Sequence, residues 1–364
     1  MRGFLIRGIV ASLGVVFGLG GCPQSADSLV TPTPDAEGND TFEAAGEISL
    51  STEGKAEFGA RILDTGDYDV FRIGTLSTGD RLVIDVQADG SSLDAIAAVF
   101  DGDENMYAFN DDRESDASNL NPLIDVVLRG PQSDYFLGVA PFPSSGSTGA
   151  YTVQITVIPG SASDAPTPQT VFMNWAGGTN VVIENVGTFS LAPFDAEDVG
   201  FSTGSTSLLK DMVQSTVANR FTGFALTLLN SDDAARPAGV HSTIYFGGRN
   251  PNAFAISEQI DTQNADQSDN AILFSSSFRS AFSIDPTLEQ MATAMGNTIA
   301  HEIGHLLGLV HTRDCLELMD TRCGNDALLR AQAFGLAPLD STVFPVGEQD
   351  ARALLEYTIG LMQP

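Results

Sequence analysis

The sequence predicts a multidomain protein, in which an N-terminal all-β sandwich is followed by an α+β domain. In the first half, short stretches alternate apolar with polar residues, and glycine- and aspartate-rich turns separate them. The second half mixes apolar strands with apolar residues at helical spacing. At 364 residues, 43% of them hydrophobic, the chain is long enough for two domains with separate cores.

The N-terminal residues have the pattern of an export signal. Arg2 and Arg7 precede an apolar run that is too short for a membrane-spanning helix. The run ends in "LGGC", which resembles the lipobox of bacterial lipoproteins. That resemblance implies a signal peptide over 1–21 and lipid on Cys22. The alternative is an ordinary signal peptide. We therefore expect an exported chain, lipid-anchored to the bacterial cell envelope (outer membrane or cell surface) or otherwise secreted.

The charge balance is strongly acidic, with 47 acidic residues against 17 basic ones and a formal net charge of −30. A field of this sign repels nucleic acid and anionic lipid headgroups. We therefore expect no nucleic-acid partner, and membrane contact only through the N-terminal lipid anchor.

Two segments rich in proline, serine and aspartate divide the rest of the chain. The first, over 22–36, has little to bury and is predicted to be a flexible tether. The second, over 160–168, is predicted to be a linker. These segments bound the predicted sandwich, 37–159, and the predicted α+β domain, 169–364.

Six segments of the first domain have strand patterns. In "DRLVIDVQA", Leu82, Ile84 and Val86 lie on one side, with the period of two expected of a half-buried strand. The other five are "DYDVFRI", "AIAAVF", "PLIDVVL", "YFLGVA" and "AYTVQITVI". Many short strands at this spacing indicate a β-sandwich.

This domain resembles the bacterial pre-peptidase C-terminal (PPC) family. The residues that carry the resemblance are "DYDVFRI", "GDRLVIDV", "LDAIAAVFDGD", "NDD" and "GAYTVQITV". It implies a jelly-roll-like sandwich that accompanies secreted peptidases and is not itself catalytic. Asp101, Asp103, Asp111 and Asp112 are candidate calcium ligands. Solvated turn carboxylates are the alternative explanation of the same residues.

The second domain alternates strand and helix patterns. "TVFMNWA", "FALTLLN" and "STIYFGG" are predicted strands. Leu208, Met212, Val213 and Val217 recur at helical spacing between the first two. A long helix is predicted to begin near Pro286 and run through "HEIGHLLGL", and a closing helix is predicted over "GEQDARALLEYTIGLM".

Three of the four histidines fall within "HEIGHLLGLVH". His301 and His305 project from one face of the predicted helix about one turn apart, so both can bind one zinc ion. Gly308 can end the helix, because glycine accepts the left-handed conformation, and His311 then returns as a third ligand. Three neutral histidines with an open fourth position are typical of catalytic zinc, since structural zinc usually has four protein ligands.

Glu302 follows the first histidine, so it lies beside the metal face and is offset from it. This position suits a general base. We interpret Glu302 as the group that accepts a proton from zinc-activated water and returns it to the leaving amine of a peptide bond.

The pattern HExxHxxGxxH with a later methionine turn resembles the metzincin signature, here in "HEIGHLLGLVH" and "LELMD". Met319 lies eight residues after His311, an interval similar to the matrix-metalloprotease-like branch. The resemblance implies a zinc metalloendopeptidase acting on proteins or peptides, with Met319 as an apolar floor beneath the zinc. Thr321 stands where the astacin- and serralysin-like branches carry tyrosine, which puts a tyrosine ligand in doubt. The alternative is a catalytically inactive surface binding or adhesion lipoprotein.

Two further features surround this cluster. Cys315 and Cys323 flank the methionine turn and are predicted to form a disulfide that braces it, since the exported chain meets an oxidising compartment. Two free buried thiols are the alternative. An acidic group precedes an apolar strand, near the edge strand that lines the cleft of related metzincins, where calcium sites also lie. Calcium binding and loop solvation both explain its members, Glu258, Asp261, Asp266 and Asp269.

Overall fold

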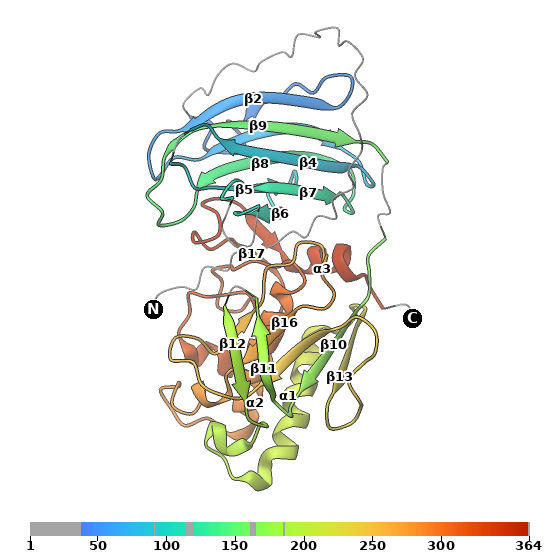
Figure 1. The fold of residues 1–364 in the computed structure, drawn as a ribbon, viewed down its shortest axis with the longest axis vertical. Helices are drawn as coiled ribbons and strands as arrows, with labels where there is room; N and C mark the ends of the chain where they lie inside the picture. Colours follow the sequence, from blue (N-terminus) through green and yellow to red (C-terminus); the bar gives the residue numbers. More distant parts are fainter. Residues whose placement is uncertain (1–37, 91, 114–118, 161–164, 185, 363–364) are drawn as a thin grey trace. The chain divides into compact units, whose positions relative to one another are not determined.

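The computed structural model describes residues 38–90, 92–113, 119–160, 165–184 and 186–362. These residues form two compact units, 38–160 and 165–362, drawn in Figure 1 and each considered by itself below. An all-β sandwich followed by an α+β unit confirms the predicted fold class. The predicted signal peptide, Cys22 and the tether lie outside the described residues. Within the described part, no helix has the length and apolar character to cross a membrane.

The N-terminal unit consists of two β-sheets. Neighbouring strands are antiparallel, apart from the parallel pair β1 and β3. The five-stranded sheet has the order β1-β3-β8-β5-β6, formed by Gly46–Glu47, Asp69–Leu76, Ser133–Pro141, Ala95–Phe100 and Met106–Asn110. The four-stranded sheet has the order β2-β9-β4-β7, formed by Lys55–Ile62, Gly149–Ile158, Arg81–Ala88 and Leu123–Val127.

Alternation along the strands builds the sandwich core. Leu82, Ile84 and Val86 of β4 are fully buried, as the period of two predicts. All six predicted strands are present. Strand β2 was not predicted although it alternates perfectly between exposed and buried residues. Its lysine, glutamate, glycine and alanines have low strand propensity and weaken the sequence signal.

The aspartates proposed as calcium ligands in this unit serve different local roles. The Asp101 carboxylate accepts the backbone N–H groups of Asp103 and Asn105, each at 2.9 Å, and so closes a turn. Asp111 and Asp112 are only 1% and 3% exposed, so solvation in a turn is the wrong explanation for these two. Within the described residues, no three of the four bring carboxylate oxygens within 4.8 Å of one another.

The C-terminal unit is built on a five-stranded sheet with the order β13-β10-β14-β16-β15. The first four of these strands are parallel and β15 is an antiparallel edge strand. In sheet order, the strands are Leu226–Asn230, Gln169–Asn174, Ser242–Phe246, Asn270–Leu273 and Ala255–Ser257. The other elements near this sheet are the helices α1 (Thr206–Arg220) and α2 (Leu288–His305) and the hairpin of β11 (Gly178–Ile183) and β12 (Gly187–Leu191).

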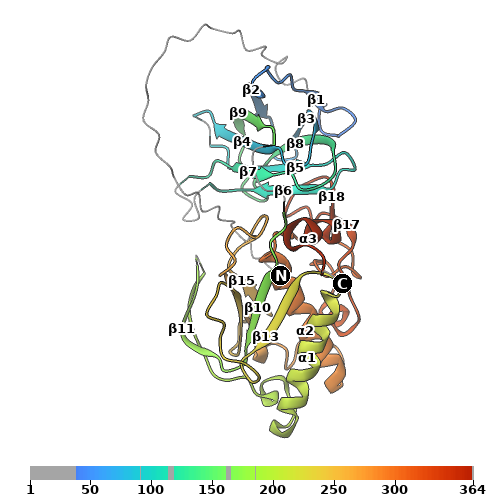
Figure 2. The ribbon, with the colours of Figure 1, turned by 90° about the vertical axis from the view of Figure 1, so that its right-hand side faces the viewer.

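Successive residues of the strands face two different layers. Val171, Ile244 and Leu273 pack in the core that the sheet shares with α1 and α2. On the other face, Ile256 and Ile272 pack against the hairpin. The sheet therefore lies between two helices and a β-hairpin, as Figure 2 shows.

The two other helices that the sequence predicted need correction. On α1, Leu209, Val213 and Val217 form the buried face, whereas Leu208 is 55% exposed. The sequence has leucine at both 208 and 209, so helical spacing allowed a buried face containing either one. Packing against the core buries the face that contains Leu209. The closing helix α3 spans only Ala351–Ile359, because the preceding Glu348–Asp350 pairs as strand β18 with β17, Leu336–Pro338.

Short 3₁₀ turns connect these elements, at Ala196–Val199, Thr203–Ser205, Ser275–Ser277 and Asn325–Leu329.

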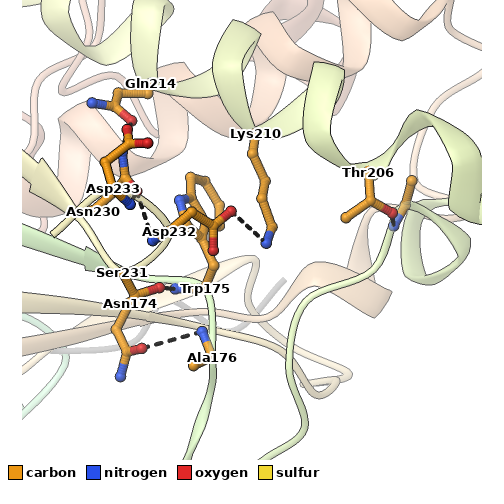
Figure 3. A network of polar contacts seen from close by, with 11 residues as sticks. Asn174, Trp175, Ala176, Thr206, Lys210, Gln214, Asn230, Ser231, Asp232 and Asp233 are labelled. Carbon is orange, nitrogen blue, oxygen red and sulfur yellow. Dashed lines mark hydrogen bonds and ion pairs between the residues drawn. The ribbon is translucent and has the colours of Figure 1, made fainter. Parts of the chain in front are cut away.

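Polar contacts hold the carboxyl ends of β10 and β13 beneath α1 (Figure 3). Lys210 Nζ donates to Asp232 at 2.9 Å and lies 5.8 Å from the Trp175 ring centroid. Asn230 Nδ2 donates to Gln214 Oε1 at 2.7 Å. The helix is thereby tied to the loop that follows β13.

Candidate metal centre

Helix α2 supplies the first two histidines. It begins with a capping box, in which the Thr287 hydroxyl accepts the N–H of Gln290 and the Gln290 side chain accepts the N–H of Thr287. It ends at His305. Because His301 and His305 are four residues apart, both point from the same face of the last turn.

Gly308 turns the chain after the helix. Its φ of +90° lies in the left-handed region, which glycine adopts without strain. A Cβ at this position would lie 3.0 Å from the carbonyl oxygen of Asp261, so a larger residue would also collide with the neighbouring backbone. The helix ends at His305, three residues before Gly308, so it is shorter than predicted, but the predicted left-handed turn at Gly308 is present and returns His311 to the end of the helix.

The three imidazoles converge through their Nε2 atoms. His305 Nε2 lies 3.0 Å from the Nε2 atoms of both His301 and His311. The Nδ1 atoms of His301 and His305 each lie 2.8 Å from a carbonyl oxygen, that of Leu318 and that of Leu309. Because a carbonyl oxygen only accepts, these Nδ1 atoms carry the protons, and the Nε2 atoms keep their lone pairs.

Burial keeps the rings neutral. It lowers the pKa of His301, lowers the pKa of His305 well below the usual range, and lowers that of His311 to about 3, with neighbouring histidines adding to the last two effects. Neutral lone pairs held at 3.0 Å repel unless a cation lies between them. Nitrogens around tetrahedral zinc, with bonds of about 2.0–2.1 Å, are about 3.3 Å apart. The donor set therefore fits a zinc ion, and His301 and His311 are each partly exposed to solvent.

Met319 lies against the helix backbone between the two ligands. It is fully buried, and its Sδ would be 2.7 Å from a Cβ added at Gly304. Only glycine allows the methionine to approach this closely. Cys315 and Cys323, on either side of the turn, form a disulfide with a Cα–Cα distance of 5.5 Å.

Glu302 is buried beside the histidines, with 7% of its surface exposed. Burial raises the pKa of its carboxyl to about 8, and the hydroxyl and N–H of Ser257 oppose this shift. Ser257 lies on β15, and its Oγ has no hydrogen bond of regular geometry to another described group. No local motif singled out Ser257, because only the pairing of β15 with the sheet brings it to the helix.

Among the described residues, the edge strand β15 pairs with β16 on one side only. Glu258, directly after it, donates its N–H to Asn270 O at 2.9 Å, so this peptide group faces β16. Antiparallel strands alternate the direction of their peptide groups, so those of Ala255 and Ser257 face away from β16. Among the described residues, the N–H of Ser257 contacts the Glu302 carboxyl group, whereas the Ala255 peptide groups and the Ser257 carbonyl remain open to an extended chain lying there.

Glu317 is a second residue near the centre that sequence patterns did not single out. Its side chain is buried, with 4% exposure. Oε2 accepts the Thr312 hydroxyl at 2.7 Å and the Met319 N–H at 2.5 Å. Burial raises the pKa of this carboxyl to about 7. Residue type alone does not show whether a glutamate is buried, so only the contacts in the fold reveal the role of Glu317.

The acidic segment after β15 is partly buried. Asp261 donates its N–H to the His305 carbonyl at 2.9 Å, which ties the segment to the end of α2. Asp269 Oδ1 accepts the Ser242 hydroxyl at 2.7 Å, whereas Oδ2 has no partner among the described residues. Burial raises the pKa of Asp261 to about 7 and that of Asp269 to about 9. In the described part, no three carboxylates of this segment lie within 4.8 Å of one another, so calcium binding stays a prediction.

Comparison with known proteins gives only distant likenesses. No family model matches the chain, and no curated protein matches it. The pre-peptidase C-terminal domain of a Bacillus anthracis collagenase is 14% identical, over 31% of this chain and 94% of that one, with a TM-score of 0.24. An archaemetzincin from Methanopyrus kandleri is 11% identical over 46% and 87%, and a zinc-dependent peptidase from Methanocorpusculum labreanum is 12% identical over 51% and 99%, each with a TM-score of 0.26. Likenesses this distant carry no conclusion about activity.

Proposed function

We propose that the protein is a zinc-dependent metalloendopeptidase of the metzincin type. The observation that supports this most directly is the convergence of three neutral histidine Nε2 atoms beside a buried carboxyl group. His301, His305 and His311 hold the zinc ion. When bound, zinc supplies Lewis acidity, which polarises a peptide carbonyl and makes water more acidic.

Glu302 moves the proton. Its carboxylate accepts a proton from the attacking water and later delivers it to the nitrogen of the leaving amine as the C–N bond breaks. Burial raises the pKa of this carboxyl, which makes its carboxylate a stronger proton acceptor. The contact with Ser257 keeps the carboxyl group facing β15.

The substrate is an extended segment of a protein or peptide. The outward-facing N–H and carbonyl of Ala255 and the carbonyl of Ser257 offer main-chain hydrogen bonds to such a segment, and these add a strand to the sheet edge. The scissile bond then lies across the end of α2, next to Glu302.

Further parts of the proposal follow the sequence patterns. The mature chain is exported and held at the bacterial cell envelope by lipid on Cys22, and the sandwich unit has no catalytic role. Met319 forms the apolar floor beneath the zinc. The disulfide between Cys315 and Cys323 braces the turn that contains it.

The test is hydrolysis of a random peptide library by the purified, zinc-loaded full chain. We expect cleavage that a chelator abolishes and added zinc restores. Glu302→Gln should lower the rate by about 10²–10⁴ with zinc content unchanged. Glu289→Gln, which changes an exposed glutamate on the same helix, is the matched control.

Two results would contradict the proposal. One is cleavage by Glu302→Gln at the wild-type rate. The other is a wild-type protein that holds zinc and cleaves no peptide in the library. The second result would favour the inactive binding lipoprotein instead.

A further inference from the structure

The buried carboxylate of Glu317 contacts no metal-ligand side chain, yet its hydrogen bonds lead to two of the ligands. It has no ion-pair partner in the described part of the chain. Oε2 accepts two short hydrogen bonds, and Oε1 accepts a long one of 3.4 Å from the N–H of Gly335. Burying a charge without an opposite charge is costly, so a position where only packing mattered would favour an apolar side chain.

The first route runs through one peptide group. The carbonyl oxygen of Leu318 lies 2.8 Å from Nδ1 of His301 and accepts a hydrogen bond from its N–H. The N–H of Met319 belongs to the same peptide group and donates to Glu317 Oε2 at 2.5 Å. The carboxylate and the imidazole are therefore joined to opposite ends of a single planar peptide unit.

The second route runs through Thr312, the residue directly after His311. The Thr312 hydroxyl donates to the same Oε2 of Glu317 at 2.7 Å, and the Thr312 N–H donates to the carbonyl oxygen of Met319 at 2.9 Å. Through this pair of bonds, the segment that carries the third ligand is fixed to the methionine turn. One carboxylate oxygen thus holds both segments.

A negative charge on the N–H side of a peptide group polarises that group. The carbonyl oxygen on the other side becomes a stronger acceptor, because hydrogen bonds in a chain reinforce one another. A stronger acceptor at Nδ1 makes the imidazole more basic at Nε2, the atom that faces the ion. Partners of this kind, one step behind the ligands, typically change metal affinity by about 10–100-fold.

We propose that Glu317 is a positioning residue of the metal centre. Through the peptide group of Leu318 and Met319 it orients His301 and strengthens Nε2 as a donor to the metal, and through Thr312 it fixes His311. This inference rests on the proposed zinc centre. It extends that proposal to a residue outside the HExxHxxGxxH motif.

The experiment measures the zinc dissociation constant of the full chain by competition with a chelator. At about pH 8, above the pKa of about 7 for Glu317, the carboxylate is ionised. Glu317→Gln has the same shape without the charge. We expect it to bind zinc about 10–100-fold more weakly, and Glu317→Asp, which restores the charge on a shorter side chain, to recover part of that loss. The ¹⁵N chemical shifts of the His301 ring, which a general loss of stability would leave in place, should move in Glu317→Gln.

Asp314→Asn is the matched control. Asp314 is an exposed carboxylate in the same loop, and its Oδ1 accepts the N–H of Leu316. The substitution removes the same charge near the centre without touching the Leu318–Met319 peptide group. Its zinc affinity should stay within about twofold of the wild-type value, well inside the range expected for Glu317→Gln.

The outcomes separate this inference from the proposed function. If Glu317→Gln binds zinc as tightly as Asp314→Asn, Glu317 has no positioning role, even though the zinc centre stands. If the wild type binds no zinc, the centre itself is wrong. If Glu317→Gln fails to fold, Thr312→Val tests the inference instead, because it removes only the hydroxyl that donates to Glu317. Weaker zinc binding by this variant supports the inference, and wild-type affinity overturns it.

Discussion

Two sets of carboxylates, one from each unit, are held in different ways. On the sandwich, Asp134 and Asp125 lie at the surface and pair with arginine, at 2.8 Å from Arg72 and 2.7 Å from Arg81. In the C-terminal unit, five carboxyl groups are buried. Asp340 pairs with Arg322 at 2.6 Å, whereas the other four have no arginine or lysine partner within the described residues. These four are Asp261, Asp269, Glu302 and Glu317.

The consequences for protonation are opposite. Hydrogen bonds from Thr75 and Arg72 lower the pKa of Asp134. Burial raises the pKa values of the four groups in the C-terminal unit to about 7–9. Carboxyl groups with such raised pKa values are common at functional sites, where the chemistry needs a pKa near the working pH. Two of the four border the histidine centre.

The largest effect is expected at Asp269, whose pKa rises from 3.8 to about 9. The folded state keeps a proton that the unfolded state releases. The stabilisation is therefore complete below about pH 3.8 and is lost as the pH rises to about 9. The amide of Asp269→Asn is neutral at every pH. When the metal-free variant and the metal-free wild type are compared between about pH 5 and pH 9, the free energy of unfolding of the variant should fall less, by about a few kcal/mol.

Urea unfolding followed by fluorescence measures this difference. Trp175 is the only tryptophan and is buried in the C-terminal unit, so it reports on that unit alone. Asp211→Asn, at an exposed position of α1, should keep the wild-type pH dependence. If Asp269→Asn lost stability with pH as steeply as the wild type, the buried carboxyl would not be protonated in the folded state.

A smaller effect is expected where the acidic segment meets the end of α2. Gly308→Ala places a Cβ at 3.0 Å from Asp261 O and forces alanine to a φ of +90°. Such strain costs about 1–3 kcal/mol. Both the unfolding free energy reported by Trp175 and the zinc affinity should fall. Gly239→Ala, in open space, should change neither, and equal behaviour of the two variants would contradict the tight fit at Gly308.

The smallest effect is expected on the sandwich. Arg81 and Asp125 are both partly exposed, with 44% and 31% of their side chains accessible. Water and salt screen such pairs, so a double-mutant cycle should give a coupling of about 0.2–1 kcal/mol. The measurement is thermal unfolding by circular dichroism at low and high salt. A coupling of several kcal/mol that salt leaves unchanged would contradict the contrast between screened surface pairs on the sandwich and buried carboxyl groups in the C-terminal unit.

The parts of the fold that could be predicted have local signals. His301, His305 and Gly308 lie within eight consecutive residues, so helical geometry and the conformational freedom of glycine predict their arrangement. Strand β4 was predictable because large β-branched and aliphatic residues repeat at every second position. Strand β2 has the same periodicity in small and charged residues and was missed.

The rest depends on contacts between distant segments. Ser257 reaches Glu302 only because β15 pairs antiparallel with β16. Glu317 matters because a peptide group folds back onto His301, which no spacing in the sequence encodes. Burial also differs between residues of the same type, since Asp269 is buried and the nearby Asp266 is exposed.

The most direct test of the central claim is metal analysis of the purified full chain after zinc loading and dialysis. The account predicts one zinc ion per wild-type chain. It predicts no bound zinc in His305→Ala, with Trp175 fluorescence that still reports a folded C-terminal unit. A wild-type chain without zinc, or a folded His305→Ala that holds as much zinc as the wild type, would contradict it.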